Sequence, residues 1–428
     1  MSTNLNTESN SNTRENKNSS KDTDSNKLWN LNFFLLWQGQ LVSAFGDSVY
    51  DIALGFWILA KTGSTGLMGI LMAAAVIPRV FLSPIAGTYV DRHNRKTILI
   101  IADIVRGIAI TFVGIAALMN FIEIWMVLVG GIILGVCGSF FNPAVQSSIP
   151  DIVPGDKLVK ANSSISMVTT GTSIVGKTAG GFLYLHLGAP LMFLINGISY
   201  IFSACTEIFI KIPNNQRDIK DINFIDDLKS GFNYVRNFTG LKYLYITIAF
   251  LNFFALMGIT LLLPLFNVKE YLGPEKYGVA MGFSLGGMFA GFLILSIIDL
   301  KKMKKSRLFI CGGIISTLVM GPLPFIPNFP IIVLLLFING FSVALLNSIL
   351  QSSLQAAVPT DMRGKVFGFR RTLSSSLIPL GMATGGILAE FISIDIIIAL
   401  GNVIILTLFT ILAFVKPVRD LINYDIKE

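Results

Sequence analysis

Charged residues inside long apolar stretches are the residues of this sequence that can do chemistry. Asp47 and Asp51 are four positions apart and so share one face of a helix. An ionised side chain at the centre of a bilayer costs roughly 2.5–3.5 kcal/mol, so such residues usually face the protein interior and serve a function. A carboxyl group that alternates between apolar surroundings and a nearby cation can bind and release a proton. We expect proton coupling at Asp47, Asp51, Arg79, Asp103 and Arg106, with the carboxyl groups binding the proton and the arginines as the nearby cations. The alternative is a static ion pair, such as Asp47 with Arg79.

A second group of residues lies in the short polar segment 87–96, Gly-Thr-Tyr-Val-Asp-Arg-His-Asn-Arg-Lys. Gly87 would let two helices approach closely. Asp91 at a helix end can meet the positive N-terminus of another helix. The basic residues can pair with acidic groups such as Asp103 or with lipid phosphates; alternatively, they only reflect the excess of positive charge in cytoplasmic loops. We expect a gate formed by Gly87, Asp91, Arg92, Arg95 and Lys96.

Residues 171–178, Gly-Thr-Ser-Ile-Val-Gly-Lys-Thr, match the phosphate-binding P-loop pattern. That pattern requires a preceding strand and a following amphipathic helix in a soluble domain. Here it falls within an apolar stretch, so we expect no nucleotide. The glycines instead permit close helix packing, and Lys177 can pair with Asp51. The group of interest in this stretch is Gly176, Lys177, Gly180 and Gly181.

The chain repeats itself at an offset of 205 residues. Segment 135–183 aligns with 340–388 without a gap, and the same glycines, amides and serines recur. In membrane proteins, a binding site commonly lies between two such repeats, which rock about it. The amides Asn142 and Gln146 align with Asn347 and Gln351. They can contact a substrate or, equally, form hydrogen bonds between helices.

The composition is that of a membrane protein. Hydrophobic residues make up 53% of the chain and charged residues 14%, whereas soluble domains have about 25% charged residues. A spanning helix needs roughly 20 apolar residues. Twelve such stretches occur, near 32–60, 66–90, 97–119, 124–150, 162–186, 189–211, 241–268, 277–299, 308–327, 330–354, 366–390 and 394–416. Long continuous runs exclude a β-barrel. We predict an all-α membrane protein with twelve transmembrane helices in two pseudo-symmetric six-helix bundles.

The distribution of Lys and Arg predicts the orientation. With a cytoplasmic N-terminus, 27 of the 33 basic residues fall on the inner side, so both termini should be cytoplasmic. The net charge of +8 follows from this rule, and a nucleic-acid partner is unnecessary. Helical spacing from Phe224 to Val235 predicts an amphipathic helix at the inner surface. The expected parts are a disordered tail (1–27), a six-helix bundle (28–211), a cytoplasmic connection (212–240), a second bundle (241–416) and a cytoplasmic tail (417–428).

Cysteine and histidine usage argues against metal and disulfide chemistry. Cys137, Cys205 and Cys311 are far apart in sequence, each in an apolar stretch. No zinc-binding spacing or disulfide framework follows from them. The two histidines, His93 and His186, fall on opposite sides of the membrane in this topology. We expect no metal, no cofactor and no enzymatic activity.

Segment 87–96 resembles the signature between helices 2 and 3 of the major facilitator superfamily: Gly, three residues, Asp-Arg, two residues, Arg and another basic residue. The resemblance extends over roughly residues 30–416. It is closest to the bacterial branch with macrolide-efflux proteins and enterobactin exporters, through Trp37–Gln40, Gly46-Asp47, Thr62–Ser64, Pro78-Arg79, Asp103 and Arg106-Gly107. The resemblance implies that Asp91 meets helix 11, starting near Lys365. Lys177 departs from the family, which often has a proline there.

These observations and the resemblance predict a secondary active transporter. We expect proton-coupled efflux of a small amphipathic molecule, of the drug, macrolide or siderophore type, by alternating access. The protein should be a monomer in the bacterial plasma membrane, with the lipid bilayer, its substrate and protons as partners. The alternatives are a lysophospholipid or nutrient transporter of the same fold and a transport-inactive membrane sensor.

Overall fold

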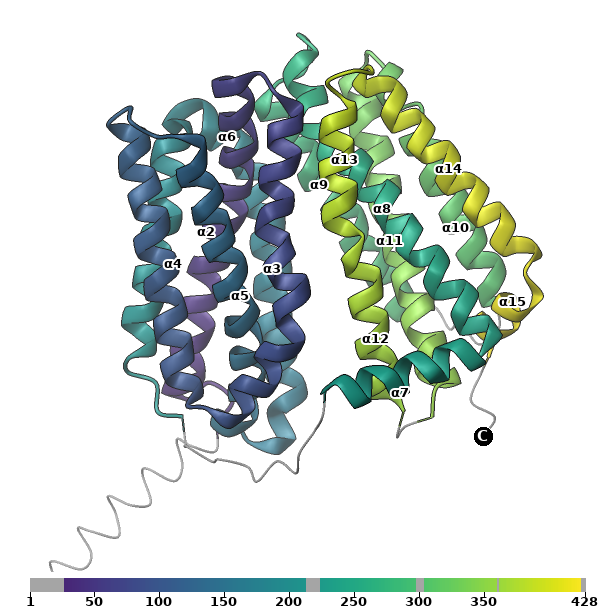
Figure 1. Cartoon of the computed structure of the whole chain (residues 1–428), viewed down its shortest axis with the longest axis horizontal. Helices are drawn as coiled ribbons and strands as arrows, with labels where there is room; N and C mark the ends of the chain where they lie inside the picture. The colour runs from purple at the N-terminus through teal and green to yellow at the C-terminus, as the bar shows by residue number, and fades with distance from the viewer. Residues whose placement is uncertain (1–26, 213–223, 298–303, 360–361, 425–428) are drawn as a thin grey trace, which may run out of the picture.

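The computed structural model describes residues 27–212, 224–297, 304–359 and 362–424, and every regular element in these residues is a helix (Figure 1). The first half contains α2 (Leu31–Thr62), α3 (Thr65–Arg92), α4 (Arg95–Leu118), α5 (Ile124–Ile152), the short turn η1 (Gly155–Lys157) and α6 (Leu158–Glu207). The second half contains α7 (Phe224–Asn237), α8 (Thr239–Val268), α9 (Pro274–Ile297), α10 (Lys305–Met320), η3 (Leu323–Phe325), α11 (Phe329–Ala357), α12 (Arg363–Ser376), α13 (Ile378–Leu388), α14 (Ile394–Phe414) and α15 (Lys416–Ile422).

Ten of these helices are long and apolar enough to cross a membrane, yet the chain crosses twelve times. The first difference lies in α6, which is two spanning helices joined at Gly188. This glycine has φ 70° and ψ 167°, a non-helical conformation that reverses the chain direction. Helix 5 therefore ends before Gly188 and helix 6 begins after it, as the apolar stretches 162–186 and 189–211 predict.

The second difference is the eleventh crossing, which is broken into α12 and α13 at Leu377. Pro379 lies in the first turn of α13 and has no N–H to donate to the preceding turn. The side-chain amide of Asn252 donates to the carbonyl of Ser374 at 3.0 Å and so satisfies one acceptor beside the break. The fold is thus the all-α, twelve-helix arrangement that the sequence predicts.

The 205-residue offset reappears in the packing of the glycines. A Cβ atom on Gly176 would lie 2.6 Å from Ser48 Cβ, and one on Gly381 would lie 2.3 Å from the carbonyl oxygen of Phe253. Gly176 and Gly381 are related by the offset, and so are Ser48 and Phe253. Each glycine therefore lets helix 5 or helix 11 contact the first helix of its own half closely.

The next glycines along these helices join the two halves. A Cβ on Gly181 would lie 1.9 Å from the carbonyl oxygen of Pro274 in α9, and one on Gly386 would lie 3.0 Å from Gly69 Cα in α3. Pro274 and Gly69 are again 205 residues apart. Two equivalent backbone contacts thus hold the halves together, one on each side of the pseudo-twofold axis.

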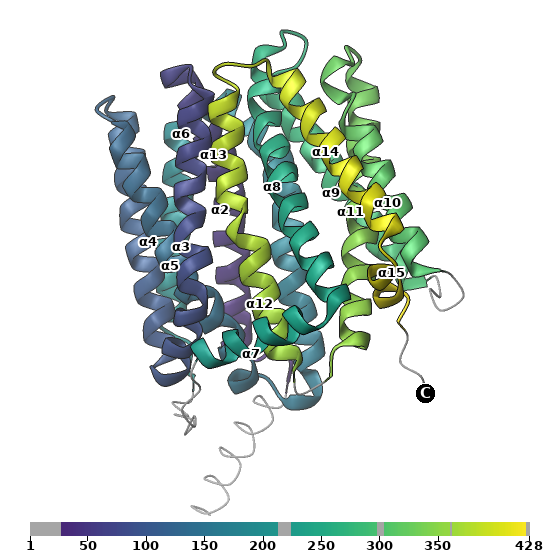
Figure 2. The same ribbon diagram turned by 45° about the vertical axis from the view of Figure 1, so that its right-hand side comes forward.

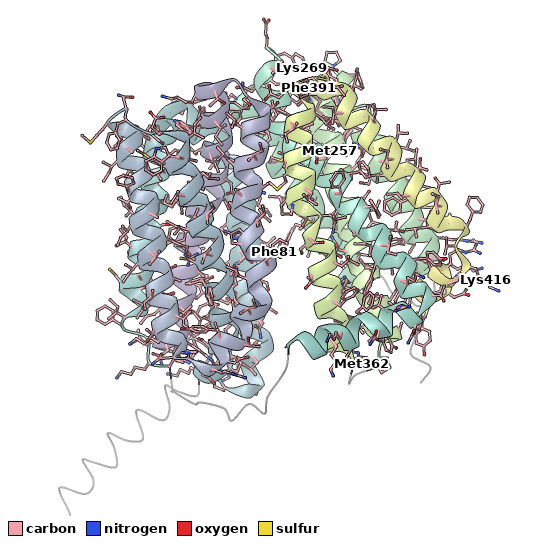
Figure 3. All side chains as sticks on the ribbon, in the orientation of Figure 1. Phe81, Met257, Lys269, Met362, Phe391 and Lys416 are labelled. Atoms are coloured by element: carbon pink, nitrogen blue, oxygen red, sulfur yellow. The ribbon has the colours of Figure 1, made fainter. Side chains whose placement is uncertain are left out.

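These contacts lie at one end of the helices, which we call the Glu390 end. There the carboxylate of Glu390, after α13, accepts a hydrogen bond of 2.7 Å from Ser64 Oγ at the start of α3. At the opposite end, which we call the α7 end, α7 lies across the start of α12 (Figures 1 and 2). Figure 3 shows Lys269 and Phe391 at the Glu390 end and Met362 beside α7.

The predicted helix at the connection between the halves corresponds to α7. Val235 is buried, and the Phe232 ring contacts the Phe369 ring of α12 at 5.7 Å between centroids. The helix therefore packs on the second half as well as presenting a polar face. The expected tails and connection fall partly on 1–26, 213–223 and 425–428, which are outside the described residues.

Candidate functional site

Asp47 lies near the middle of α2, where α2 packs against helix 6. A Cβ on Gly46 would lie 2.5 Å from Ser199 Oγ and 2.6 Å from Asn196 Oδ1, so the glycine permits this close approach. Tyr200 is fully buried, and its hydroxyl donates a hydrogen bond to Asp47 Oδ1. In this conformation the partner of Asp47 Oδ1 is therefore a tyrosine hydroxyl, and a pair of Asp47 with Arg79 is not among the salt bridges of the described residues.

Arg106 lies buried between two aromatic rings. Its guanidinium carbon is 4.1 Å from the Phe141 ring centroid and 4.4 Å from the Tyr200 ring centroid, which places a cation over two π faces. The guanidinium also donates to Asp103 Oδ1, one turn away on α4. Asp103 is fully buried. Tyr200 thus contacts both Asp47 and Arg106, and it links the carboxylate of α2 to the ion pair of α4.

Glu207, which the sequence analysis did not single out, belongs to the same buried region. Its side chain is 1% exposed at the end of α6, and both carboxyl oxygens lack a hydrogen-bond partner. Ser203 Oγ and Asp103 Oδ2 are buried and without a partner as well. The signal in the sequence was one acidic residue inside the apolar stretch 189–211.

Asp51 differs from Asp47 in that its side chain is accessible to solvent. Lys177 of helix 5, Arg79 of α3 and Tyr277 of α9 lie within electrostatic range of its carboxylate. Because these residues come from both halves, Asp51 faces the protein interior and not lipid. The expected direct ion pair between Asp51 and Lys177 is not among the salt bridges of the described residues in this conformation.

A cavity of about 350 Å³ separates the two halves. It extends from the middle of the helices toward the α7 end, and the break in helix 11 forms part of its wall. The lining residues are Val76, Arg79, Val80, Ser83, Gly138, Asn142, Gly368, Thr372, Ser375 and Ile378. Its volume lies within the usual range of about 300–1,000 Å³ for small-molecule sites. Arg79 and Asn142 are exposed there and can contact a polar group of a ligand.

The other three amides lie elsewhere. Asn347 lines a second cavity of about 290 Å³ inside the second half, together with Asn252, Asn339 and Asn402. Gln351 Oε1 accepts from Arg370 at 3.2 Å, which is a contact between helices of one half. Gln146 is exposed. The four amides are related by sequence, yet they do not form a single site.

The second cavity reveals an asymmetry between the halves. Asn252 occupies in the second half the position of Asp47 in the first, because the two are 205 residues apart. By the same offset, Leu308, Cys311 and Leu412 take the places of Asp103, Arg106 and Glu207. The ionisable network is therefore specific to the first half, and neutral amides occupy the equivalent interior of the second.

The segment 87–96 lies at the α7 end. Asp91 Oδ1 accepts a hydrogen bond of 3.4 Å from Ser147 Oγ of α5. Arg95 is buried and bonds to Asp151 and to the carbonyl of Ser147, and Lys96 donates to the carbonyl of Ile208 at 2.6 Å. Arg95 thus pairs with an acidic group, but this group is Asp151 and not Asp103, which pairs with Arg106.

No helix approaches Gly87 closely in this conformation, so its expected role in a closed gate stays a prediction. A Cβ atom built on Gly87 would have no neighbour within 4 Å. Arg92 is exposed. At this end, α3 approaches α7 and α12 of the second half less extensively than it approaches α13 at the Glu390 end, where Gly69 lies against Gly386.

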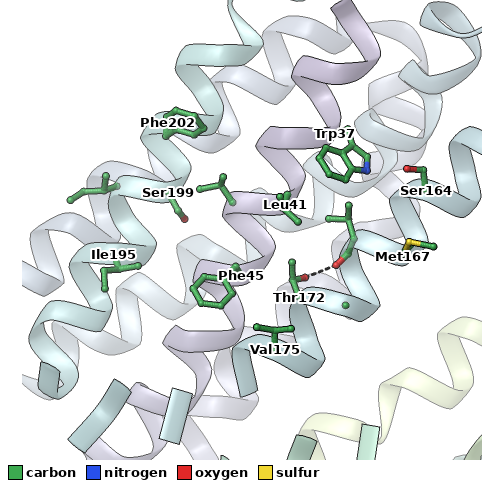
Figure 4. A pocket seen from close by; sticks show the side chains of 14 residues that line it. Trp37, Leu41, Phe45, Ser164, Met167, Thr172, Val175, Ile195, Ser199 and Phe202 are labelled. Carbon is green, nitrogen blue, oxygen red and sulfur yellow. Dashed lines mark hydrogen bonds between the residues drawn. The ribbon is translucent and has the colours of Figure 1, made fainter. Parts of the chain in front are cut away.

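A separate apolar groove of about 810 Å³ lies on the outside of the first half (Figure 4). It forms because α2 and helix 5 touch at Gly176 and diverge toward the α7 end. Its walls include Trp37, Leu41, Phe45, Met167, Ile198 and Phe202. The hydroxyl of Thr172 donates to the carbonyl of Val168 and so presents no free polar group to the groove. Apolar parts of a molecule dissolved in the bilayer can bind here.

Comparisons with known proteins agree with this geometry. The sequence model described as Major Facilitator Superfamily matches residues 36–382. The chain is 25% identical over 400 residues to macrolide efflux protein A of Streptococcus pyogenes, covering 92% of this chain and 98% of that protein. It is 23% identical over 375 residues to the multidrug efflux pump Tap of Mycobacterium tuberculosis, covering 83% and 87%.

Solved structures share the fold at low identity. A bacterial homologue of the iron transporter ferroportin, in an inward-facing state, superposes with a TM-score of 0.72 and 14% identity, covering 91% of this chain and all of that one. The nucleoside transporter NupG gives a TM-score of 0.69 and 13% identity, covering 88% and 99%. At this identity the likeness establishes the fold alone.

Proposed function

Because this chain belongs to the major facilitator superfamily, a family of membrane transporters, we propose that it exports a small amphipathic molecule in exchange for protons. The observation that carries the proposal is a cavity between the halves, lined by Arg79 and Asn142, beside carboxyl groups inside the membrane. The halves 28–211 and 241–416 act as the two bodies that rock about this cavity.

The orientation is part of the proposal. The α7 end is cytoplasmic, and both termini are on the cytoplasmic side, since 27 of the 33 basic residues then lie inside. The cavity extends toward that end and the halves touch at the Glu390 end, so the conformation is inward-open. Substrate enters the cavity from the cytoplasm or from the inner leaflet.

Asp47 and Asp51 provide the proton-coupling groups. Both lie on the same face of α2, and each has a different environment: Asp47 accepts from Tyr200, and Asp51 lies within electrostatic range of Lys177 and Arg79. A proton bound at Asp51 removes one of the negative charges that offset these cations. Alternate exposure of the pair to the two sides of the membrane then exchanges protons for substrate, with Asp103 and Arg106 as a supporting ion pair.

The apolar surroundings and the names of the relatives support the proposed substrate class. The groove of about 810 Å³ gives apolar molecules a place to bind at the level of the inner leaflet. Relatives along nearly the whole chain are named macrolide efflux protein A and multidrug efflux pump. We therefore propose a drug, macrolide or siderophore type of molecule as cargo.

A lysophospholipid transporter is the second candidate, and the same groove favours it. An acyl chain fits an apolar groove that opens toward lipid, whereas a polar nutrient does not. The two candidates differ in their cargo and not in their mechanism. A transport-inactive sensor is the remaining alternative, and it has no need of ionisable residues inside the membrane.

The test is transport by the purified full chain in liposomes with an imposed pH gradient. Macrolides, siderophores and lysophospholipids are offered in turn, and the paired Asp47→Asn and Asp51→Asn variant is the matched control. Gradient-driven movement of a drug by the parent and not by the control supports the proposal. Movement of lysophospholipid alone selects the second candidate, and no gradient-driven movement of any cargo by the parent contradicts proton-coupled transport.

A further inference from the structure

Glu207, Ser203 and Asp103 form a buried polar cluster at the end of helix 6. Glu207 is 1% exposed, and the other two side chains are fully buried. Both Glu207 oxygens, Asp103 Oδ2 and Ser203 Oγ lack a well-aligned hydrogen-bond partner, although the Ser203 hydroxyl lies beside both carboxyl groups. A buried polar atom without a partner destabilises the fold, and a buried charged atom without a partner destabilises it more. The cluster therefore lacks a hydrogen-bond donor that would pair with these acceptor oxygens.

The charges around Glu207 do not balance if every carboxyl group is ionised. From α4, Asp103 and Arg106 act on Glu207, and from α2, Asp47 acts on Asp103. From α5, the Cys137 thiol and the Phe141 ring approach Arg106. Lys96 of α4 bonds to the carbonyl of Ile208 and is half-buried at the α7 end. Arg106 thus faces three carboxyl groups, namely Asp47, Asp103 and Glu207. Arg79 of α3 acts on Tyr200 and on Asp51, which in turn interacts with Asp47, but it is not among the groups that act on Glu207.

We propose that Glu207 carries a proton in this conformation and shares it with Asp103, so that the pair is a second proton-binding site. A neutral carboxyl group avoids the desolvation penalty of a buried anion. Its O–H can donate to an Asp103 oxygen or to Ser203, and the hydroxyl of Ser203 can donate to the remaining acceptor. One proton therefore satisfies most of the orphaned atoms and leaves two anions, Asp47 and Asp103, that share the positive charge of Arg106.

The site connects to Asp47 through Arg106 and Tyr200. Along helix 6, Glu207 and Tyr200 are seven residues apart, which is about 10 Å. Tyr200 bonds to Asp47 and lies against Arg106, and Arg106 bonds to Asp103. A proton that binds to Asp47 neutralises that carboxylate and leaves the positive charge of Arg106 to Asp103. Because the full charge of Arg106 then stabilises an ionised Glu207–Asp103 pair, this pair releases its shared proton to the cytoplasm. One proton is therefore bound at Asp47 as another is released from the pair.

This inference rests on the proposed proton coupling for its role in transport, but the site itself does not depend on it. The second half contains leucine at the positions of Asp103 and Glu207, namely Leu308 and Leu412. A helix bundle of this fold can therefore be built without the cluster. Retention of three carboxyl groups in the first half points to proton binding and not to packing.

The experiment is infrared spectroscopy of the full chain in lipid nanodiscs at neutral pH. We expect a protonated carboxyl C=O band that shifts in heavy water and is lost in Glu207→Gln. Glu123→Gln changes an exposed glutamate of a loop and is the matched control, which should leave the band unchanged. Glu207→Leu, which introduces the residue of the second half, provides another variant in case the glutamine variant does not fold.

A band that is absent from the parent, or that remains at full intensity in both Glu207 variants, overturns the proposal. Because the measurement needs no substrate and no gradient, it separates the site from the proposed function. A Glu207-dependent band in a protein that fails to use a pH gradient supports the proton site and contradicts the coupling role. Gradient-driven transport without the band contradicts the site alone.

Discussion

The carboxylate of Glu390, just after α13, accepts a hydrogen bond of 2.7 Å from the backbone N–H of Gly66 in the first turn of α3. Ser64 and Thr65 donate their hydroxyls to the same oxygen at 2.7 and 3.2 Å. An anion at a helix N-terminus is stabilised by the unpaired N–H groups and the helix dipole. Glu390 thus joins the two halves at the end where the cavity is closed.

Asp91 lies at the α7 end of α3, at the opposite end of α3 and the broken helix α12–α13 from Glu390. It is one residue from the last residue of α3, and α12 begins with Arg363 at that end of the molecule. At the Glu390 end, Glu390 after α13 meets the N-terminus of α3. We therefore propose that Asp91 of α3 meets the N-terminus of α12 when the cavity is closed at the α7 end and open at the Glu390 end. In this conformation Asp91 bonds to Ser147 instead.

Replacing Glu390 by Gln should weaken the closed end. An exposed charge at a helix N-terminus is worth about 0.3–1 kcal/mol, so we expect a two- to fivefold shift toward conformations that open at the Glu390 end. Spin labels on the outer ends of α3 and α13 can measure the distance distribution. An unchanged distribution in Glu390→Gln would mean that the glycine contacts alone keep this end closed.

The same contact should depend on pH. Hydrogen bonds from the Gly66 N–H first, and then from Ser64, lower the pKa of Glu390 below its usual value. A group whose pKa is lowered in the bonded state stabilises that state above the usual pKa, about 4.3 for Glu. The contact should persist at neutral pH and weaken only as the pH falls through the lowered value. Glu390→Gln should remove this acid-dependent change in distance.

Asp91→Asn should greatly reduce transport while expression and membrane insertion remain near normal. The amide keeps the shape of the side chain and loses the charge that faces the helix N-terminus, worth at most about 2 kcal/mol in a partly buried site. Transport in liposomes and surface expression are the two measurements. Transport equal to that of the parent would show that Asp91 is only a solvated residue at the end of α3.

Asp47→Asn should abolish movement driven by a pH gradient while exchange of substrate for substrate persists. An amide oxygen still accepts from Tyr200, but it cannot bind and release the proton. Asp51→Asn should have a milder effect, and adding Lys177→Met should restore what it loses, because the two charges offset one another. Full gradient-driven transport by Asp47→Asn would place the coupling site elsewhere, with Asp103 as the next candidate.

Gly181→Ala should destabilise the closed Glu390 end, because the added Cβ would lie 1.9 Å from the Pro274 carbonyl oxygen. We expect a cost on the order of 1–3 kcal/mol for this overpacking. Gly87→Ala is the matched control, since its Cβ would meet open space in this conformation. Thermal unfolding and the spin-label distances should therefore change in the first variant and stay near parental values in the second.

A reporter fused after Glu428 tests the orientation. An enzyme that is active only in the cytoplasm should give strong signal, and one that is active only outside should give none. The same pair of reporters placed in the loop before Glu123 should give the reverse result. Strong outside activity after Glu428 would invert the proposed topology and, with it, the assignment of the inward-open state.

The sequence alone was sufficient for the number and order of the helices, because each crossing requires a long apolar run and the bilayer permits little else. The 205-residue repeat identified the twofold relation, and the glycines Gly181 and Gly386 do join the halves in equivalent ways. The apolar stretches of the sequence also predicted that Asp47 and Asp103 lie within membrane-spanning helices. Helical periodicity reports the face on which a residue lies, and nothing more.

The tertiary structure decided which side chains meet, because that depends on the neighbouring helix and not on spacing along one helix. Tyr200 lies 153 residues from Asp47 and could not be identified as its partner from the pattern. Arg95 bonds to Asp151 and not to Asp103 for the same reason. Glu207 stood out only once its carboxyl oxygens were found buried and without partners, since burial among α2, α4 and α6 is a property of the packed bundle.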